Sequence, residues 1–286
     1  MPQIVLKAEG SEMTAPSMRV GNVEVQGLSD GILKTSVDFV IGMDRAQAAQ
    51  LVGSADGSIF IPVNNFLIRR GGKVILIDAG AGNTMQPTLG KLPANLLANG
   101  IAPATVTHIV MTHLHPDHAN GLVDDSGNPH YPNAEIVVHQ TEADFWMRPD
   151  LVNDEDRVKG NRARTKKNLK PYLERIRRVR DGEEFSGFIP VLAPGHTPGH
   201  TCWLVASGGS GFMAFGDVVH LSAIQISHPD AALTYDLDKD LAIKSRKRIL
   251  DMAAAERFAI AGAHVNAPGF GYVVRKGTSF AFEPAV

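Results

Sequence analysis

The stretch Thr112-His113-Leu114-His115-Pro116-Asp117-His118 holds four potential metal ligands within six positions. His113 and His115 are two residues apart, so in an extended segment both imidazoles project to the same face. Pro116 then bends the chain, which turns Asp117 and His118 towards a second point nearby. Two imidazoles at one point, with a carboxylate and an imidazole at the next, make up the first half of a dinuclear metal site.

The other ligands of such a site are expected downstream, because each ion needs three or more protein ligands. Candidates are His196 in PGHTPGH (194–200), Asp217 after Gly216, and His264 after Gly262-Ala263. Each follows an apolar run and has glycine close by, which allows close backbone approach. Taken singly, each is as consistent with an ordinary loop residue. Taken together with the upstream motif, they predict a two-metal centre.

The apolar runs that precede these residues predict an α/β (α+β) fold. Runs of four to six residues rich in Val, Ile and Phe and ended by polar or loop-forming residues are typical of buried strands. Three segments have helical patterns: 44–55 with Asp44 as N-cap, 93–99 ending at Gly100, and 239–256 with Asp238 or Asp240 as cap. The predicted strands are 73–77, 108–111, 135–138, 189–193, 212–215 and 258–261, with 22–26 and 59–68 before them and a possible bend at Asn64-Asn65.

The chain shows no clear internal repeat and no low-complexity linker, so we expect a single domain over residues 1–286. Residues 1–20 form an N-terminal arm in this interpretation. Residues 141–185 form a polar insertion, helical in pieces, that lies over the site, with breaks at Pro149 and Pro171. The basic run 157–170 within it is interpreted as a solvated helix face.

Composition excludes several classes of function. The chain has 286 residues, 44% of them hydrophobic and 20% charged, and a formal net charge of -2. That balance gives no electrostatic reason to expect nucleic acid or an anionic membrane as partner. Neither a signal-peptide core in the first twenty residues nor an apolar run of 18 is present, so we expect a cytoplasmic protein. Cys202 is the only cysteine, so metal ligands must be nitrogen and oxygen atoms apart from at most one thiolate.

The order of these motifs, from about Val20 to Phe282, resembles the metallo-β-lactamase superfamily of hydrolases. That resemblance implies a four-layer αββα sandwich with two divalent metal ions at one edge, most simply Zn, with Fe, Mn or Co as alternatives. It implies that Asp217 and a hydroxide bridge the ions, and that Asp78 in ILIDAG lies beneath the site. The implied ligands are His113, His115 and His196 for the first ion, and Asp117, His118 and His264 for the second.

Longer stretches resemble one branch, that of methyl parathion hydrolase and organophosphate-hydrolysing, lactonase-like enzymes. They are PTLG (87–90), HLHPDHANGL (113–122), PNAEIVVHQTEADFW (132–146), APGHTPGHT (193–201) and AGAHVNAPGFGYV (261–273). The resemblance suggests a homodimer. Where aryl-phosphotriester hydrolases of this branch place aromatic residues, this chain has Met85-Gln86 and Gly160-Asn161-Arg162. Fewer rings are therefore expected around an aryl group.

We therefore expect a dinuclear hydrolase of carboxylic esters or lactones, with phosphotriester cleavage as a side activity. Asp117 and Asp217 are the expected catalytic residues. Met85, His220 and Trp146 are expected to contact substrate, with a packed loop position as the alternative for His220 and a core position for Trp146. His200 is expected to hydrogen-bond behind the ligands. The alternatives are a dedicated organophosphate hydrolase and a non-catalytic metal-binding module. An Asp after Gly216 argues against a true β-lactamase.

Overall fold

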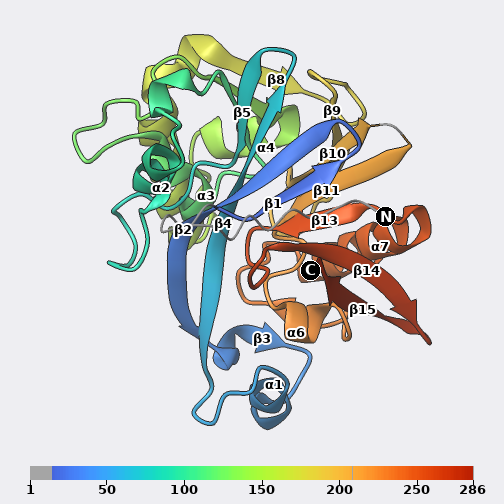
Figure 1. Ribbon diagram of the computed structural model, residues 1–286. Coiled ribbons are helices and arrows are strands. Elements are labelled where there is room, and N and C mark those ends of the chain that lie inside the picture. The colour runs from blue at the N-terminus through green and yellow to red at the C-terminus, as the bar shows by residue number, and fades with distance from the viewer. Residues whose placement is uncertain (1–14, 208, 286) are drawn as a thin grey trace.

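The computed structural model describes residues 15–207 and 209–285, and two β-sheets packed face to face form its centre (Figure 1). The first sheet has the strand order β1-β2-β4-β5-β6-β7-β8. Its strands β5 to β8 run parallel, so their carboxyl ends meet at one edge. The bounds are β1 Ser17–Val20, β2 Val23–Ser36, β4 Ser58–Arg70, β5 Lys73–Ile77, β6 His108–Val110, β7 Glu135–His139 and β8 Ile176–Val179.

The second sheet has the strand order β15-β14-β13-β11-β10-β9, and a small two-stranded sheet pairs β12 with β3. Within it β11 and β13 are parallel neighbours, which brings the loops after both strands to the same edge. The bounds are β9 Phe188–Leu192, β10 Thr201–Ser207, β11 Ser210–Gly216, β13 Ala259–Gly262, β14 Phe270–Lys276 and β15 Ser279–Pro284, with β3 Val40–Ile41 and β12 Ala232–Leu233.

Helices cover the outer faces of both sheets (Figure 1). The α-helices are α1 Arg45–Leu51, α2 Leu92–Ala98, α3 Pro116–Ala119, α4 Gln140–Met147, α5 Asp156–Leu169, α6 Ser222–Gln225 and α7 Lys239–Glu256. Four 3₁₀ turns are η1 Val37–Phe39, η2 Pro103–Thr105, η3 Asn120–Leu122 and η4 Lys170–Arg175.

Three buried cores correspond to the interfaces between four layers. One core joins the first sheet to α2, α4 and α5, with Leu76 and Ile109 facing Leu96 and Leu169. A second lies between the sheets, and a third joins the second sheet to α7. Burial of apolar area, about 25 cal/mol per Å², is the main force holding the layers together. The αββα sandwich expected from the sequence is therefore confirmed.

The predicted strands agree with the structure except in the first hairpin. All six apolar runs listed above are strands, and α1, α2 and α7 have the predicted positions, with Asp44 and Asp238 capping α1 and α7. The strand expected at 22–26 continues to Ser36, past a bulge at Ser29/Gly31. The possible bend at Asn64-Asn65 is wrong, because both residues pair with β2 and the Asn64 amide donates to the carbonyls of Gly262 and Val265.

The expected arm and insertion each contain a strand. Residues 17–20 form β1 and pair with β2, while residues 1–14 of the arm lie outside the described residues. The insertion contains α4 and α5, but ends in the edge strand β8, whose short Ile-Arg-Arg-Val sequence gave no clear apolar run. On α5, Arg162 is fully buried, so the basic run is not solvated throughout. The single-domain boundaries stay a prediction.

Candidate metal centre

The HxHxDH motif spans the loop after β6 and the first residues of α3. The parallel strand β6 ends at Val110, and the next residues extend across the sheet edge before the chain turns into a short helix. Pro116 occupies the first turn of α3, where its missing N–H leaves no bond unmade. The extended backbone of His115, with φ -69° and ψ 161°, therefore changes to helix within one residue. This change separates the two histidines of the extended segment from Asp117 and His118.

The downstream candidates lie on loops at the same edge. His196 follows β9, Asp217 follows β11 and His264 follows β13. Gly216 has φ +53°, and a Cβ there would lie 2.7 Å from Nε2 of His200. Only glycine therefore lets the chain turn so closely around His200 and deliver Asp217 to the centre.

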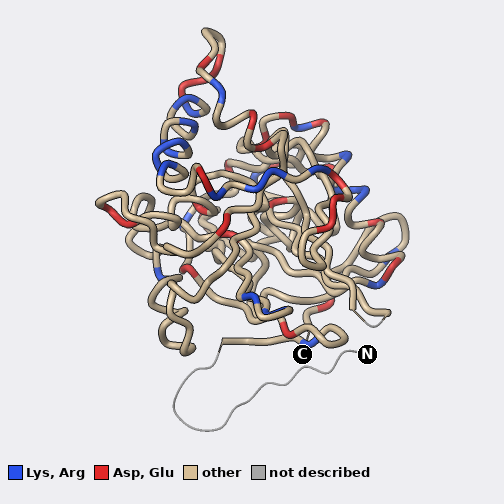
Figure 2. Tube along the Cα trace, turned by 90° about the horizontal axis from the view of Figure 1, so that it is seen from above, with Lys and Arg blue, Asp and Glu red and all other residues tan. Residues whose placement is uncertain are grey.

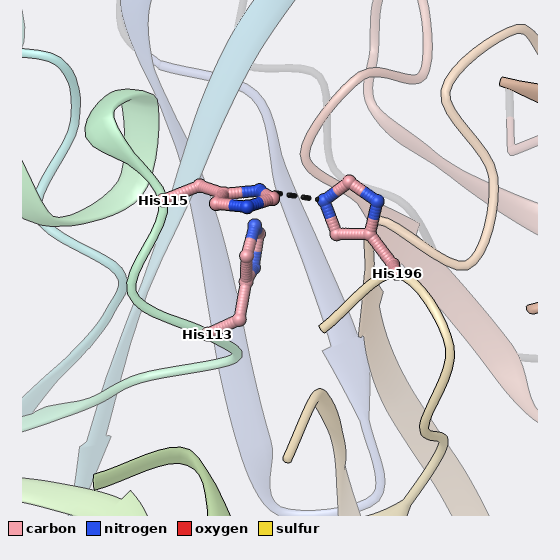
Figure 3. A group of neighbouring side chains, drawn as sticks. All are labelled: His113, His115 and His196. Atoms are coloured by element: carbon pink, nitrogen blue, oxygen red, sulfur yellow. Dashed lines mark hydrogen bonds between the residues drawn. The ribbon is translucent and has the colours of Figure 1, made fainter. Parts of the chain in front are cut away.

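These seven side chains gather into two groups. In each group, one potential ligand atom per residue lies within 4.8 Å of the others. Figure 3 shows the first group with its three imidazoles converging, where Nδ1 of His115 lies 2.8 Å from Nε2 of His196. The first group is His113, His115 and His196, and the second is Asp117, His118, Asp217 and His264.

Asp217 lies between the two groups. Its Oδ2 is 3.6 Å from Nε2 of His113 and 3.4 Å from Nε2 of His196. Its Oδ1 is 3.1 Å from Nε2 of His118 and 3.3 Å from Nε2 of His264. Each oxygen thus faces one group, which is the geometry a bridging carboxylate requires. A third grouping, His196, Asp217 and His220, overlaps the first.

Unpaired buried atoms show that the residues fit metal ions. Nε2 of His113, Nε2 of His118 and Oδ1 of Asp217 are buried without a hydrogen-bond partner among the described residues. Each such atom costs about 1–3 kcal/mol when nothing satisfies it. Several at one point, all nitrogen or carboxylate oxygen, are the donor set that Zn and related divalent ions bind.

Hydrogen bonds behind the ligands fix which ring nitrogen faces the centre. Asp78 lies 2.9 Å from Nδ1 of His118, and the carbonyl of Pro62 lies 2.8 Å from Nδ1 of His264. Carboxylate and carbonyl oxygens only accept, so each Nδ1 carries the proton and Nε2 is free for a metal. Asp78 also accepts from Thr112 N and Oγ1 at 2.7 and 2.8 Å, and its φ of +59° points it under the motif.

His200 lies behind the centre as expected. Its Nε2 accepts from the backbone N–H of Asp217 at 2.9 Å, so it holds the loop that carries the bridging carboxylate. Burial, more than the nearby His196, lowers the pKa of His200 to about 3, so this imidazole stays neutral and can accept.

Two supporting carboxylates were not singled out in the sequence. Asp236 is buried and lies 3.0 Å from Nδ1 of His196. Glu142 on α4 accepts from Leu114 N in the motif loop and from Gly199 N in the His196 loop, at 2.9 and 3.0 Å. Neither belongs to a ligand motif, and only the folded chain brings them to the centre.

Burial and neighbouring charges together raise the pKa of some candidate ligands and lower the pKa of others. Burial lowers the pKa of His113 and His115 well below the usual value, with nearby imidazoles adding to it. Burial also opposes charge on His118, but Asp217, Asp117 and Asp78 outweigh it and raise its pKa. Burial opposes charge on Asp217 as well, yet the surrounding imidazoles lower its pKa well below the usual value. In the metal-free site, the proton on His118 thus supplies positive charge where a metal cation would bind.

A cavity of about 530 Å³ opens on this centre. The candidate ligands His115, Asp117, His196, Asp217 and His264 lie along it. Of the expected substrate contacts, Met85 and His220 line it, and Nε2 of His220 is 2.9 Å from Oδ2 of Asp217. Other lining residues are Leu33, Lys34, Thr35, Ser36, Phe39, Ile61, Gln86, Pro116, Arg157, Asn161 and Tyr235.

Trp146 is not on the cavity wall, and its expected substrate contact is wrong. Its side chain is fully buried in the core beneath α4, where Nε1 donates to Glu142 Oε1 at 2.7 Å. Its ring meets the outer edge of His115 with the centroids 5.5 Å apart. The core position is therefore the correct alternative. Cys202, the one thiol that could have been a ligand, is buried and belongs to neither ligand group.

A family model described as the metallo-beta-lactamase superfamily matches residues 59–264, more than half of the chain, and spans all seven candidate ligands. The chain belongs to the metallo-β-lactamase superfamily. Two solved structures of high similarity support this. One is described as hydrolase AbOPH in the beta lactamase superfamily, with 28% identity, a TM-score of 0.91, and coverage of 96% of this chain and 99% of that one.

The other structure is AidC, described as a dizinc quorum-quenching lactonase in complex with the product N-hexnoyl-L-homoserine. Its sequence is 28% identical to this chain, and the two structures superpose with a TM-score of 0.89. The match covers 96% of this chain and 98% of AidC.

Curated relatives match over a shorter span. An N-acyl homoserine lactonase of Bacillus thuringiensis is 25% identical over 55% of this chain and 55% of its own. N-acyl homoserine lactonase AttM of Azorhizobium caulinodans is 28% identical over 41% of this chain and 43% of its own. The chain thus spans about half the length of the curated relatives it matches. Within residues 15–207 and 209–285, no helix is both long and apolar enough to cross a bilayer.

Proposed function

We propose that this chain is a dinuclear metal hydrolase that cleaves carboxylic esters or lactones. The observation that carries the proposal is Asp217, whose two oxygens face two separate groups of ligands at the floor of an open cavity. One ligand group alone would suit a structural metal. Two groups joined by one carboxylate and open to a cavity suit catalysis by paired ions.

The ions would be held by His113, His115 and His196 on one side and by Asp117, His118 and His264 on the other, with Asp217 shared. Bound there, they would supply an activated water as nucleophile and positive charge beside the reacting oxygen. Zn is the metal we propose first, in keeping with the dizinc description of AidC; Fe, Mn and Co are alternatives.

The chain itself supplies positioning and proton transfer. Asp117 is the partly exposed carboxylate of the site, and its Oδ2 lies 3.4 Å from Nε2 of His264. We propose that Oδ2 accepts a proton from the attacking water and passes it to the departing alkoxide. Asp217 holds the two halves of the centre at a fixed separation, which fixes the direction of attack. His220, beside Asp217 on the cavity wall, would contact the substrate.

Lactones are the substrate class we favour. Support comes from the relatives described as N-acyl homoserine lactonases and from AidC with its hydrolysed product. Apolar side chains along the cavity, Leu33, Ile61 and Met85 among them, would accept a hydrocarbon chain attached to the ring.

A phosphotriester is the second candidate substrate. Although Trp146 is absent from the wall, Phe39 and Tyr235 line the cavity with their ring centroids 4.6 Å apart. The cavity therefore offers more aromatic surface than Met85-Gln86 and Asn161 alone predicted. These two rings, tilted 38° to each other, could accept an aryl leaving group. Membership in the methyl parathion hydrolase branch stays a prediction.

A hydrolysis panel on zinc- and cobalt-loaded protein tests the proposal, with a chelated sample as control. It compares an acyl-homoserine lactone, a γ- or δ-lactone, an aryl ester and a phosphotriester by kcat/KM. We expect the lactone or ester to exceed the phosphotriester by tenfold or more and all activity to vanish on chelation. A faster phosphotriester would favour the dedicated organophosphate hydrolase. Two bound metals with no turnover would favour the non-catalytic binding module.

The homodimer and the cytoplasmic location expected from the sequence stay predictions. Light scattering on the full chain would measure the mass in solution, and fractionation of the producing cells would test the location.

A further inference from the structure

The cavity above the metal centre has cations at its mouth. The candidate ligands are buried or partly buried and form its floor, whereas Lys34 and Arg157 are exposed and line its outer part. Among the described residues that line it, the acids are Asp117 and Asp217, and both face the centre. The whole chain carries a net charge of -2, yet the charged side chains at the outer part of the cavity are both positive.

Arg157 is held at the cavity without being neutralised there. It lies in the first turn of α5, one turn before Asn161, which lines the same cavity. Its Nη1 donates to the backbone carbonyl of Tyr235 at 3.4 Å, which tethers α5 to the opposite wall. Its nearest carboxylate is that of Glu155, 4.0 Å from Nη2 and 74% exposed. A contact of this length in water neutralises little charge.

The other cations of α5 differ from Arg157 in this respect. Figure 2 shows the Lys and Arg positions gathered along this projecting helix. Arg162 is buried and forms ion pairs with Asp150 and Asp154, so its charge is used within the insertion. Lys166 is exposed and is not among the residues that line the cavity. Arg157 alone among the three presents its guanidinium to the space above the centre.

We propose that the cavity selects esters or lactones whose acyl part ends in an acidic group, such as a carboxylate. This inference rests on the proposed function. The acid oxygens would accept hydrogen bonds from Arg157, with Lys34 adding positive charge, while the hydrocarbon segment lies along Leu33, Ile61 and Met85. The scissile carbonyl then reaches the floor. Hydrolysis adds one water across the acyl C–O bond and releases an acid and an alcohol, so no further reactant is needed.

The hydrogen bond to the Tyr235 carbonyl holds Arg157 at the cavity wall, so the length of the acyl chain should matter. An acid at the end of too short a chain cannot reach Arg157, and too long a chain must fold back. The preference should therefore peak at one chain length, whereas simple attraction of anions would show no such peak.

The experiment compares 4-nitrophenyl monoesters of dicarboxylic acids with neutral 4-nitrophenyl esters of the same carbon number, over a series of increasing chain lengths. We expect kcat/KM of metal-loaded protein to favour the acidic ester by roughly tenfold at one length, the size of one charge-assisted hydrogen bond. The difference should lie mainly in KM and shrink in high salt. Equal rates for the two series at every length would overturn the inference.

Paired variants separate recognition from general charge. Arg157→Gln should lower kcat/KM of the acidic ester about tenfold more than that of the neutral ester. Lys166→Gln removes the same charge from the same helix outside the cavity, and it should leave the ratio unchanged. An equal loss in both variants, or an equal loss on both substrates in Arg157→Gln, contradicts the inference.

A binding measurement keeps the inference distinct from the proposed function. If metal-loaded protein hydrolyses neither these esters nor the lactones of the panel, the proposed function fails. The diacid mono-anilide, which resists hydrolysis, would then be compared by calorimetry with its neutral counterpart. Tighter binding of the acidic anilide that is lost in Arg157→Gln supports the inference on its own, and equal binding overturns it.

Discussion

The buried carboxylate of Asp236 lies 3.0 Å from Nδ1 of His196 and also accepts the backbone N–H of Leu233 at 2.9 Å. It thus fixes the imidazole of a candidate ligand to the loop between β12 and α7. Burial opposes charge on Asp236, but the hydrogen bond to His196 outweighs it and lowers its pKa to about 2. A negatively charged Asp236 therefore orients His196 with Nε2 towards the centre.

Replacing Asp236 by Asn should weaken metal binding at the first ligand group. Loss of a carboxylate behind a metal-bound imidazole typically lowers metal affinity by about 10–100-fold. Competition with a chromogenic chelator would measure the affinity. Asp230→Asn is the control, because Asp230 is exposed on the neighbouring loop and pairs with Lys247 at the surface. Unchanged affinity in Asp236→Asn would show that the His196 orientation does not depend on this contact.

Replacing Asp217 by Ala should leave a chain that cannot hold two ions. Both groups lose the carboxylate that faces them, so metal content should fall from two ions per chain to one or none, and turnover should fall by about 10³-fold or more. Metal analysis after dialysis gives the count, with Asp125→Ala on an exposed loop as the matched control. Two retained ions with full activity would exclude a bridging role.

Metal uptake should release protons at pH 7.5. Burial alone would lower the pKa of His264, but Asp217 and Asp117 raise it to about 10, so the metal-free imidazole is protonated. An imidazole that binds a metal must be neutral, so binding should release this proton and affinity should rise with pH. In the metal-free protein the same raised pKa stabilises the fold below about pH 6.5, and that contribution is lost as pH rises through 10. Calorimetry in buffers of different ionisation enthalpy counts the protons, and a count of zero contradicts this assignment.

Replacing Trp146 by Phe should affect stability more than substrate binding. The change leaves Glu142 Oε1 without the indole N–H and creates a small void in a fully buried position, at a cost of about 1–3 kcal/mol. KM should change less than twofold, because the ring is not on the cavity wall. Phe39→Leu, on the wall, should show the reverse. Denaturant unfolding and steady-state kinetics on both variants would separate the two effects. A large KM change in Trp146→Phe would show that the Trp146 ring contacts the substrate after all.

Some features of this protein depend only on short-range patterns, and these could be predicted from the amino-acid sequence. Alternating histidines and a proline in HxHxDH specify local ligand geometry, because side-chain direction in an extended segment has a period of two. Apolar runs ending in polar or loop-forming residues indicated the strands, and the resemblance to the superfamily implied the αββα class. Asp44 and Asp238 indicated helix starts for the same local reason.

Other features depend on which distant segments come into contact, and these became visible only in the folded chain. Asp236 and Glu142 belong to no ligand motif, and they support the centre only because folding places their carboxylates behind His196 and beneath two ligand loops. Trp146 carries the same helical signal whether it faces a core or a cavity, and packing alone assigned it to the core. In the sequence, Arg157 is one of several cations in a basic run. Only its contact with the Tyr235 carbonyl in the folded chain distinguishes it from the others. A local pattern of residues reflects the conformational preference of the backbone. Long-range contacts depend instead on the burial of whole surfaces, and a short stretch of sequence does not specify them.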